Sequence, residues 1–167
     1  EVTPELENVK VELGFAQGAQ RVFLNGDDVS EKIRTPQMSM YASNVSAIPS
    51  VRAFLFDLQR DIANSNNIIM DGRDIGTVVL PNADVKIFLT ASSTARAKRR
   101  YDEHTKKGGT VNFDKILEEI ELRDYNDSNR KIAPLKQADD AILIDTTEIG
   151  LDDSIKLVID TITQKLH

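Results

Sequence analysis

Residues 68–76 read IIMDGRDIG, a short apolar run that changes abruptly into glycine and charged residues. This pattern is typical of a buried β-strand that presents charged side chains at its carboxyl end. In open α/β sheets, ligands bind at that edge. The planar guanidinium of Arg73 suits a carboxylate or a phosphate. The alternative is an ordinary surface turn that contains a salt bridge.

Further along the chain, strands and helices alternate. Buried strands are predicted at residues 85–89 and 141–145, and helices at about 95–107, 113–129 and 151–166. Such alternation predicts a parallel sheet that forms the remainder of an α/β core over residues 66–167.

Residues 1–65 are expected to form an appended mixed lobe. Its predicted strands lie at residues 9–13 and 21–24, with a short one near Val29 beyond the tight-turn dipeptide Asn25-Gly26. Thr35-Pro36 is a helix-start signal for a helix that should end near Ile48, and Ser50 is expected to cap the next one.

Composition limits the possible functions. The chain has 167 residues, a formal charge of −6, 40% hydrophobic residues and no cysteine. Cysteine-based catalysis and zinc–thiolate sites are therefore excluded, and nucleic-acid binding, which usually shows a basic surface, is not expected. No apolar run approaches the roughly 20 residues of a membrane span, so a cytoplasmic location without membrane contact is expected.

One face of the predicted helix at 113–129 carries a stripe of side chains that changes from apolar to charged halfway along. It begins with apolar side chains and continues with Arg123, Asp127 and Arg130. Charges on an inward stripe are costly unless they meet partners or a ligand. Two interpretations stay open: a ligand site, or a frayed end with solvated charges that add little stability.

Two further sets of residues are weaker candidates. Arg96 and Arg100 are neighbours on a helix face and could clamp phosphate, although a solvated face is commoner. Gly108-Gly109 would let residues 96–112 swing as a lid. Ser43 and Arg52 flank the break at Pro49, but their spacing alone does not require them to meet.

No Ser-His-Asp set, metal-binding cluster, dinucleotide-binding fingerprint or G-x-x-x-x-G-K-[ST] phosphate loop is present in the 167 residues. Several separated motifs nevertheless resemble bacterial cytidylate (CMP) kinases, in the same order and over essentially the whole chain. They are NGDDVS at 25–30, S-x-x-S-x-x-P-x-V-R at 43–52, DGRDIGT at 71–77, VKIFL at 85–89 and R-D-x-x-D-x-x-R-x-x-A-P-L at 123–135.

The resemblance implies a P-loop kinase-like parallel sheet, an inserted monophosphate-binding lobe at residues 1–65 and an arginine-bearing lid. It implies phosphoryl transfer from ATP to CMP or dCMP, with Mg²⁺ carried by ATP and no protein metal ligand. The resemblance also implies which part of the nucleotides each residue contacts. The cytosine would be contacted by Ser43, Arg52 and Asp74, and the ribose by Arg123 and Asp127. The phosphates would be contacted by Arg73 and Arg130, and ATP by the lid residues Arg96 and Arg100.

The family's first strand, its phosphate loop with lysine, and the following helix have no counterpart here. The expectation is therefore a carboxyl-terminal portion of a cytidylate kinase, inactive alone. The alternatives are a non-catalytic nucleotide-binding fragment, half of a split enzyme whose missing segment is a separate chain, and a kinase for another nucleoside monophosphate.

Overall fold

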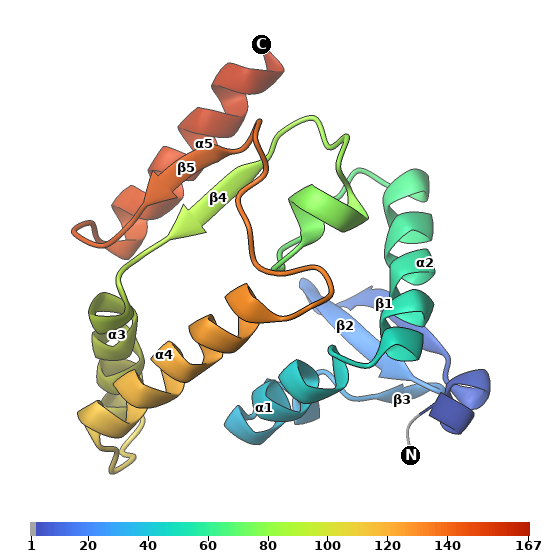
Figure 1. Cartoon of the computed structure of the whole chain (residues 1–167), viewed down its shortest axis with the longest axis horizontal. Helices are drawn as coiled ribbons and strands as arrows, with labels where there is room; N and C mark the ends of the chain where they lie inside the picture. Colours follow the sequence, from blue (N-terminus) through green and yellow to red (C-terminus); the bar gives the residue numbers. More distant parts are fainter. Residues whose placement is uncertain (1–2) are drawn as a thin grey trace. The chain divides into compact units, whose positions relative to one another are not determined.

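A computed structural model describes residues 3–167 and divides the chain into two compact units (Figure 1). The N-terminal unit comprises Glu1–Ile68 and the C-terminal unit comprises Ile69–His167.

The N-terminal unit contains a three-stranded antiparallel sheet. It starts with the 3₁₀ helix η1 (Thr3–Asn8), followed by the strands β1 (Val11–Ala16), β2 (Ala19–Leu24) and β3 (Asp27–Asp28), which pair in the order β1-β2-β3. Asn25 and Gly26 form the turn between β2 and β3, with φ angles of 51° and 89°. Asparagine and glycine tolerate this left-handed conformation best. The predicted antiparallel piece and its tight turn are confirmed.

Two helices follow the sheet, after the short 3₁₀ helix η2 (Lys32–Arg34). They are α1 (Pro36–Val45) and α2 (Pro49–Ser65). The hydroxyl of Thr35 accepts a hydrogen bond from the Met38 amide, as its predicted capping role requires. The expected cap at Ser50 is wrong, because the helix already begins at Pro49 and Ile48 is the capping residue. Proline's fixed φ suits the first helical position, which places the start earlier.

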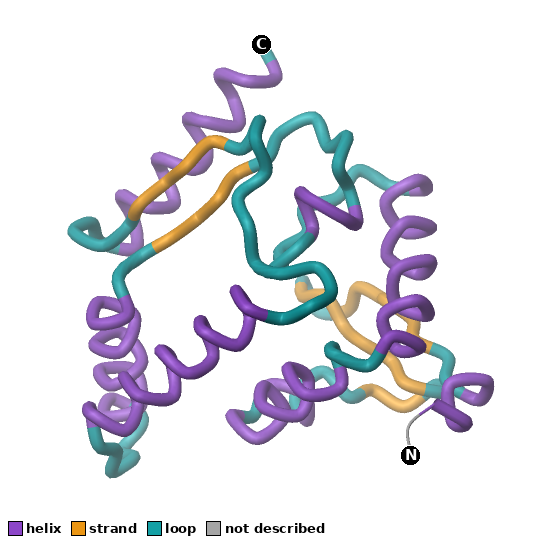
Figure 2. Tube along the Cα trace, viewed as in Figure 1, coloured by secondary structure: helices purple, strands orange, loops and turns teal. Residues whose placement is uncertain are grey.

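The C-terminal unit is a mixed α/β structure with a parallel sheet (Figure 2). Strand β4 (Ile87–Thr90) leads through α3 (Ser93–Lys106) and α4 (Phe113–Asn129) to β5 (Ile142–Asp145), and α5 (Leu151–Leu166) ends the chain. Strands β4 and β5 pair with Leu89 opposite Ile144. The predicted alternation of strands and helices is confirmed.

The strand predicted at residues 68–70 is not formed. Within residues 3–167 the structure places no strand against this segment, and Ile69 is 95% exposed. An extended apolar segment becomes a strand only when a neighbour accepts and donates its backbone hydrogen bonds. The segment instead leads into a single π-helical turn, η3 (Ile75–Val79).

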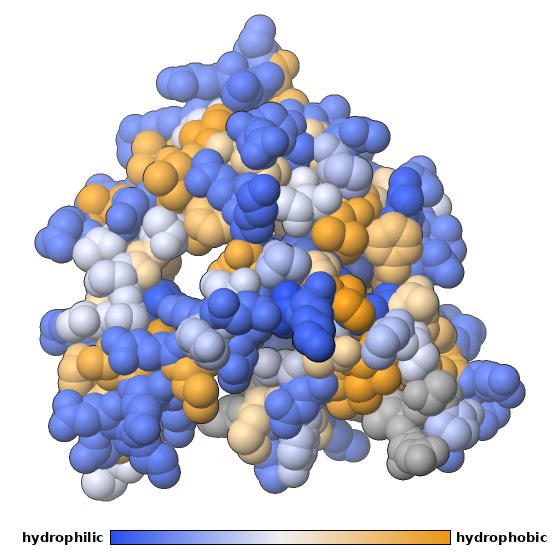
Figure 3. All heavy atoms as spheres, in the orientation of Figure 1, coloured by the Kyte–Doolittle hydropathy of each residue, from blue (hydrophilic) through white to orange (hydrophobic). Residues whose placement is uncertain are grey.

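A small core in the C-terminal unit joins its sheet to its helices. Its buried apolar side chains are Val79, Ala91, Ala97, Ile116 and Ile144. Other apolar side chains lie on the surface, including Leu89, Leu143 and Leu151, and apolar atoms gather over β4, β5 and α5 (Figure 3). None of the helices within residues 3–167 is both long and apolar enough to span a membrane.

Candidate functional site

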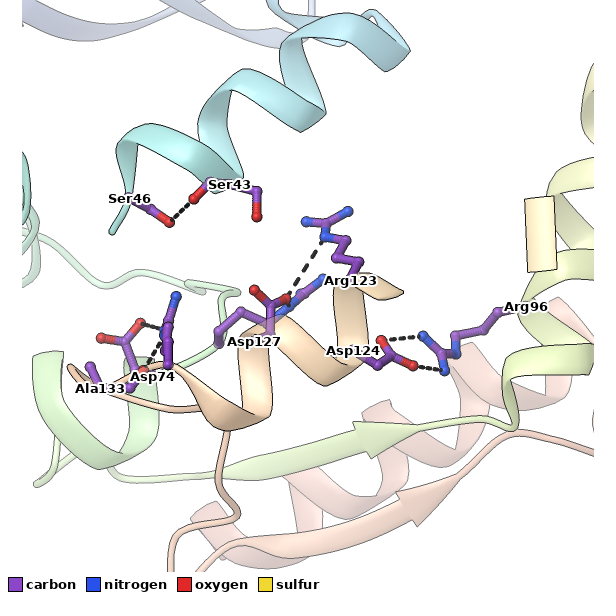
Figure 4. A network of polar contacts seen from close by, with 10 residues as sticks. Ser43, Ser46, Asp74, Arg96, Arg123, Asp124, Asp127 and Ala133 are labelled. Carbon is purple, nitrogen blue, oxygen red and sulfur yellow. Dashed lines mark hydrogen bonds and ion pairs between the residues drawn. The ribbon is translucent and has the colours of Figure 1, made fainter. Parts of the chain in front are cut away.

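In the C-terminal unit, Asp127 brings two arginines together. The Nε of Arg73 donates a hydrogen bond to Oδ2 of Asp127 at 2.8 Å, and the Nε of Arg123 lies 3.8 Å from the same oxygen. The Asp127 side chain is only 8% exposed, whereas both arginines reach solvent. Figure 4 shows Arg123 and Asp127 projecting from α4, one helical turn apart.

The sequence explains why Asp127 is held firmly. Helix α4 is capped by Asn112, whose side chain accepts from the Lys115 amide, and Ile116 anchors the helix in the core. The amide of Leu135 closes the other end by donating to the carbonyl of Asp127 at 2.8 Å. The charged half of the predicted stripe is therefore ordered, and the frayed-helix interpretation is wrong.

Arg123 is partly buried among charges of both signs. Burial lowers the pKa of Arg123, and the charges of Arg73 and Arg100 lower it further, while Asp127 acts in the opposite direction. Because the guanidinium groups of Arg73 and Arg123 share the single carboxylate of Asp127, one positive charge is left over beside this partly buried part of α4. Such an arrangement favours an anion with several oxygen acceptors.

A second ion pair lies within the same unit. Nη2 of Arg130 is 3.4 Å from Oδ1 of Asp74, and the two side chains are 14% and 11% exposed. The Nε of Arg130 also donates to the carbonyl of Ala133, a residue with a φ of 48°. The structure thus connects the DGRD segment to the end of α4 at two places, through Arg73 and through Arg130.

The predicted lid arginines are both on α3. The guanidinium of Arg96 holds Asp124 of α4 with two hydrogen bonds of 2.9 and 2.5 Å. Arg100 forms a looser pair with Glu119, at 3.9 Å.

Ser43 and Arg52 belong to the N-terminal unit, where both contact Ser46. The hydroxyl of Ser46 donates to the carbonyl of Ser43 at 2.8 Å, and Nη1 of Arg52 approaches the carbonyl of Ser46 at 3.4 Å. The turn between α1 and α2 thus brings the two predicted residues close together. Nucleotide contacts of these residues stay a prediction.

Sequence reasoning missed three polar residues with structural roles. Asp124 was part of the quoted motif but was assigned no role, although its pair with Arg96 joins two helices. Arg99 donates to the carbonyl and the hydroxyl of Thr146 beyond β5. Lys86 is nearly buried and pairs with Asp140. These partners lie tens of residues apart in the chain, so no local spacing indicates them.

A metal cluster and a pocket elsewhere in the C-terminal unit are two alternatives to this cluster. No group of three His, Cys, Asp or Glu side chains within residues 3–167 is placed to hold a metal ion. A polar pocket of about 270 Å³, lined by Gly76, Thr77 and residues 136–140, contains none of the predicted residues. The arginine–aspartate cluster therefore remains the candidate site.

Comparison with known proteins agrees with the motifs in this cluster. The family model for cytidylate kinase matches residues 2–165. The cytidylate kinase of Caldicellulosiruptor saccharolyticus is 48% identical over 155 residues, which are 93% of this chain and 69% of that protein. That of Lactiplantibacillus plantarum is 46% identical over 164 residues, 98% of this chain and 72% of that protein.

Proposed function

The chain belongs to the cytidylate kinase family, and we propose that it supplies the acceptor-binding residues of an enzyme that transfers the γ-phosphoryl group of ATP to CMP or dCMP. In this proposal the chain is the carboxyl-terminal portion of the enzyme. The observation that carries it is the convergence of Arg73 and Arg123 on Asp127, which leaves an excess of positive charge at an ordered helix.

The proposed roles follow the nucleotide from phosphate to base. Arg73 and Arg130 bind the phosphates, and Arg123 and Asp127 hold the ribose. Ser43, Arg52 and Asp74 recognise the cytosine. Support for these roles comes from the family motifs that contain the residues and, for the arginines, from the positive charge of the cluster.

In the proposed reaction, a phosphate oxygen of CMP attacks the γ-phosphorus of ATP in line, and ADP leaves. Chemistry of this kind depends on positioning and on stabilisation of negative charge more than on a general base. Arg73 and Arg130 orient the acceptor oxygen, and the positive charge of Arg100 in the lid stabilises negative charge on the transferred phosphoryl group. None of these residues is assigned to Mg²⁺; the ion would be carried by ATP and would neutralise charge on its phosphates.

The direct test is ADP formation by the full-length protein in the presence of ATP, Mg²⁺ and CMP. We expect Arg73→Ala to lower kcat/KM by at least about 100-fold, because a charge-assisted contact to the reacting phosphate is lost. Lys98→Ala is the matched control, since Lys98 is an exposed cation that pairs with Asp102 on its own helix. Wild-type activity in Arg73→Ala would contradict the proposed role of the cluster.

A second candidate is a nucleotide-binding protein without turnover. It is favoured by the absence of a G-x-x-x-x-G-K-[ST] loop from residues 1–167. Calorimetric titration with CMP, combined with the ADP assay, distinguishes the two functions. A binding protein without turnover would bind CMP with an affinity that depends on Arg73 and would form no ADP.

A further inference from the structure

Each nitrogen of the Arg96 guanidinium donates a hydrogen bond to a protein oxygen, although 37% of the side chain is exposed. Its Nη1 and Nη2 atoms meet the two oxygens of Asp124 at 2.9 and 2.5 Å, and its Nε donates to the carbonyl of Ala91 at 2.9 Å. The hydrogen bonds that Arg96 donates to the Asp124 carboxylate raise the pKa of Arg96. Ala91 is buried immediately after β4, so one side chain connects the end of the sheet to α4.

Asp124 lies directly beside the charged stripe of α4. It is the neighbour of Arg123 in the chain, and at about 100° per residue it is displaced around the helix by about 60° from Asp127. A bidentate guanidinium–carboxylate pair fixes both distance and orientation. A pair at this position therefore restrains the rotation of α4 about its own axis. Figure 4 shows Arg96 reaching Asp124 from α3, while Arg123 and Asp127 project elsewhere on the helix.

The other links between α3 and α4 are less well suited to this restraint. Arg100 and Glu119 are 3.9 Å apart, and Ser93 donates a single hydrogen bond to Glu121. Tyr101 and Phe113 contact edge to face at the other end of the hairpin, with ring centroids 6.1 Å apart. Within the described residues, the only bidentate link is thus the one beside the stripe.

We propose that Arg96 and Asp124 form a positioning pair that orients Arg123 and Asp127 toward the acceptor nucleotide. The proposal rests on the proposed function and deepens it. Arg96 acts through Asp124, without contacting ATP. The pair holds α4 in a fixed orientation relative to the end of β4, and so fixes where the ribose-binding residues Arg123 and Asp127 lie. Misplacement of such groups by about 1 Å is enough to cost roughly 100-fold in rate.

A double-mutant cycle in the full-length enzyme tests the pair. We expect Arg96→Gln and Asp124→Asn each to raise KM for CMP roughly tenfold while KM for ATP stays within about twofold. The double variant should be no worse than either single variant, because both changes remove the same interaction. Arg96→Lys should restore little, since lysine lacks the planar fork.

The exposed pair of Lys98 and Asp102 on α3 provides the matched control. Lys98→Gln and Asp102→Asn remove a salt bridge from the same helix and should leave both KM values unchanged. The proposal is overturned if Arg96→Gln raises KM for ATP while Asp124→Asn has no effect, because Arg96 then contacts the phosphate donor. It is also overturned if the two single effects are fully additive.

Failure of the proposed function gives a different result. If Arg123→Ala leaves KM for CMP unchanged, the stripe does not bind the acceptor, and both proposals fail together. If Arg123→Ala raises KM for CMP while both pair variants behave as wild type, only the positioning role fails.

Discussion

Arg130 differs from the other arginines of the cluster in its burial. Its side chain and that of Asp74 are 14% and 11% exposed, whereas Arg123 is 46% exposed. The sequence placed both arginines on one stripe and suggested that a solvated Arg130 adds little stability. The side chain is not solvated, because only 14% of it is exposed and its Nε donates to the carbonyl of Ala133 beyond α4. Its contribution to stability stays a prediction.

The first prediction follows from this difference. Arg130→Ala should lower the free energy of unfolding by about 1–3 kcal/mol, since a partly buried, charge-assisted contact is lost. Arg123→Ala, from the same helix stripe, should change it by less than about 0.5 kcal/mol. Urea unfolding, monitored by circular dichroism, measures the free energy of unfolding of both variants. Equal stabilities of the two variants would show that the pair with Asp74 contributes nothing.

A second prediction concerns base selection by Asp74. Cytosine carries an amino donor where uracil carries a carbonyl acceptor, so an ionised Asp74 would attract the first and repel the second. Asp74→Asn should lower activity with CMP and narrow the CMP-to-UMP ratio of kcat/KM by about tenfold or more, because an amide can offer either a donor or an acceptor. A lower activity with an unchanged ratio would mean that Asp74 only braces its arginine partner.

At the scale of elements, the pair of Lys86 and Asp140 joins the beginnings of β4 and β5. The Lys86 side chain is 9% exposed, and its Nζ lies 2.5 Å from Asp140 and 2.6 Å from the carbonyl of Pro81. The hydrogen bond from Lys86 holds the pKa of Asp140 below its ordinary value. Because the pKa is lowered on folding, ionised Asp140 stabilises the native state.

The third prediction gives the pH range of this effect. The stabilisation is fully present above the ordinary aspartate pKa near 4 and is lost as pH falls through the lowered pKa of the folded state. Asp140→Asn should therefore reduce the melting temperature at pH 7 and have less effect at pH 3. Asp139→Asn, at the exposed neighbouring position, is the control. A loss of stability that is the same at both pH values would exclude the ionic mechanism.

The elements themselves were largely predictable from local patterns. Thr35 and Asn112 cap helices because their side chains accept backbone hydrogen bonds, and the Asn25-Gly26 turn follows from the left-handed preference of both residues. The failure at residues 68–70 has the opposite cause, since a strand depends on a partner that its own sequence does not specify.

The candidate site was predictable only in part for the same reason. Arg123 and Asp127 are four residues apart on one helix, so periodicity reveals their proximity. The joining of Arg73 to Asp127, 54 residues away, follows from tertiary packing. For Arg96, the sequence predicted the helix on which it lies but not its hydrogen bonds to Asp124, 28 residues away.

For the whole molecule, the fourth prediction is that purified residues 1–167 do not transfer phosphate from ATP to CMP. The backbone amides and lysine of a phosphate loop supply much of the electrostatic stabilisation in such kinases, and no segment of this sequence has that pattern. Coupled-enzyme measurement of ADP gives the answer, with a cytidylate kinase that carries the phosphate loop as positive control. Steady turnover by the 167 residues alone would contradict the prediction.

The tip of the α3–α4 hairpin offers a site for a spectroscopic probe. Gly108 has a φ of 80° with open space around it, and Lys107 beside it is exposed. Since the chain contains no cysteine, Lys107→Cys would create a unique thiol for a fluorophore or a spin label. Arg96 and Asp124 lie at the opposite end of the hairpin from this tip, so a label there would test whether added nucleotide moves the hairpin and would leave this pair intact.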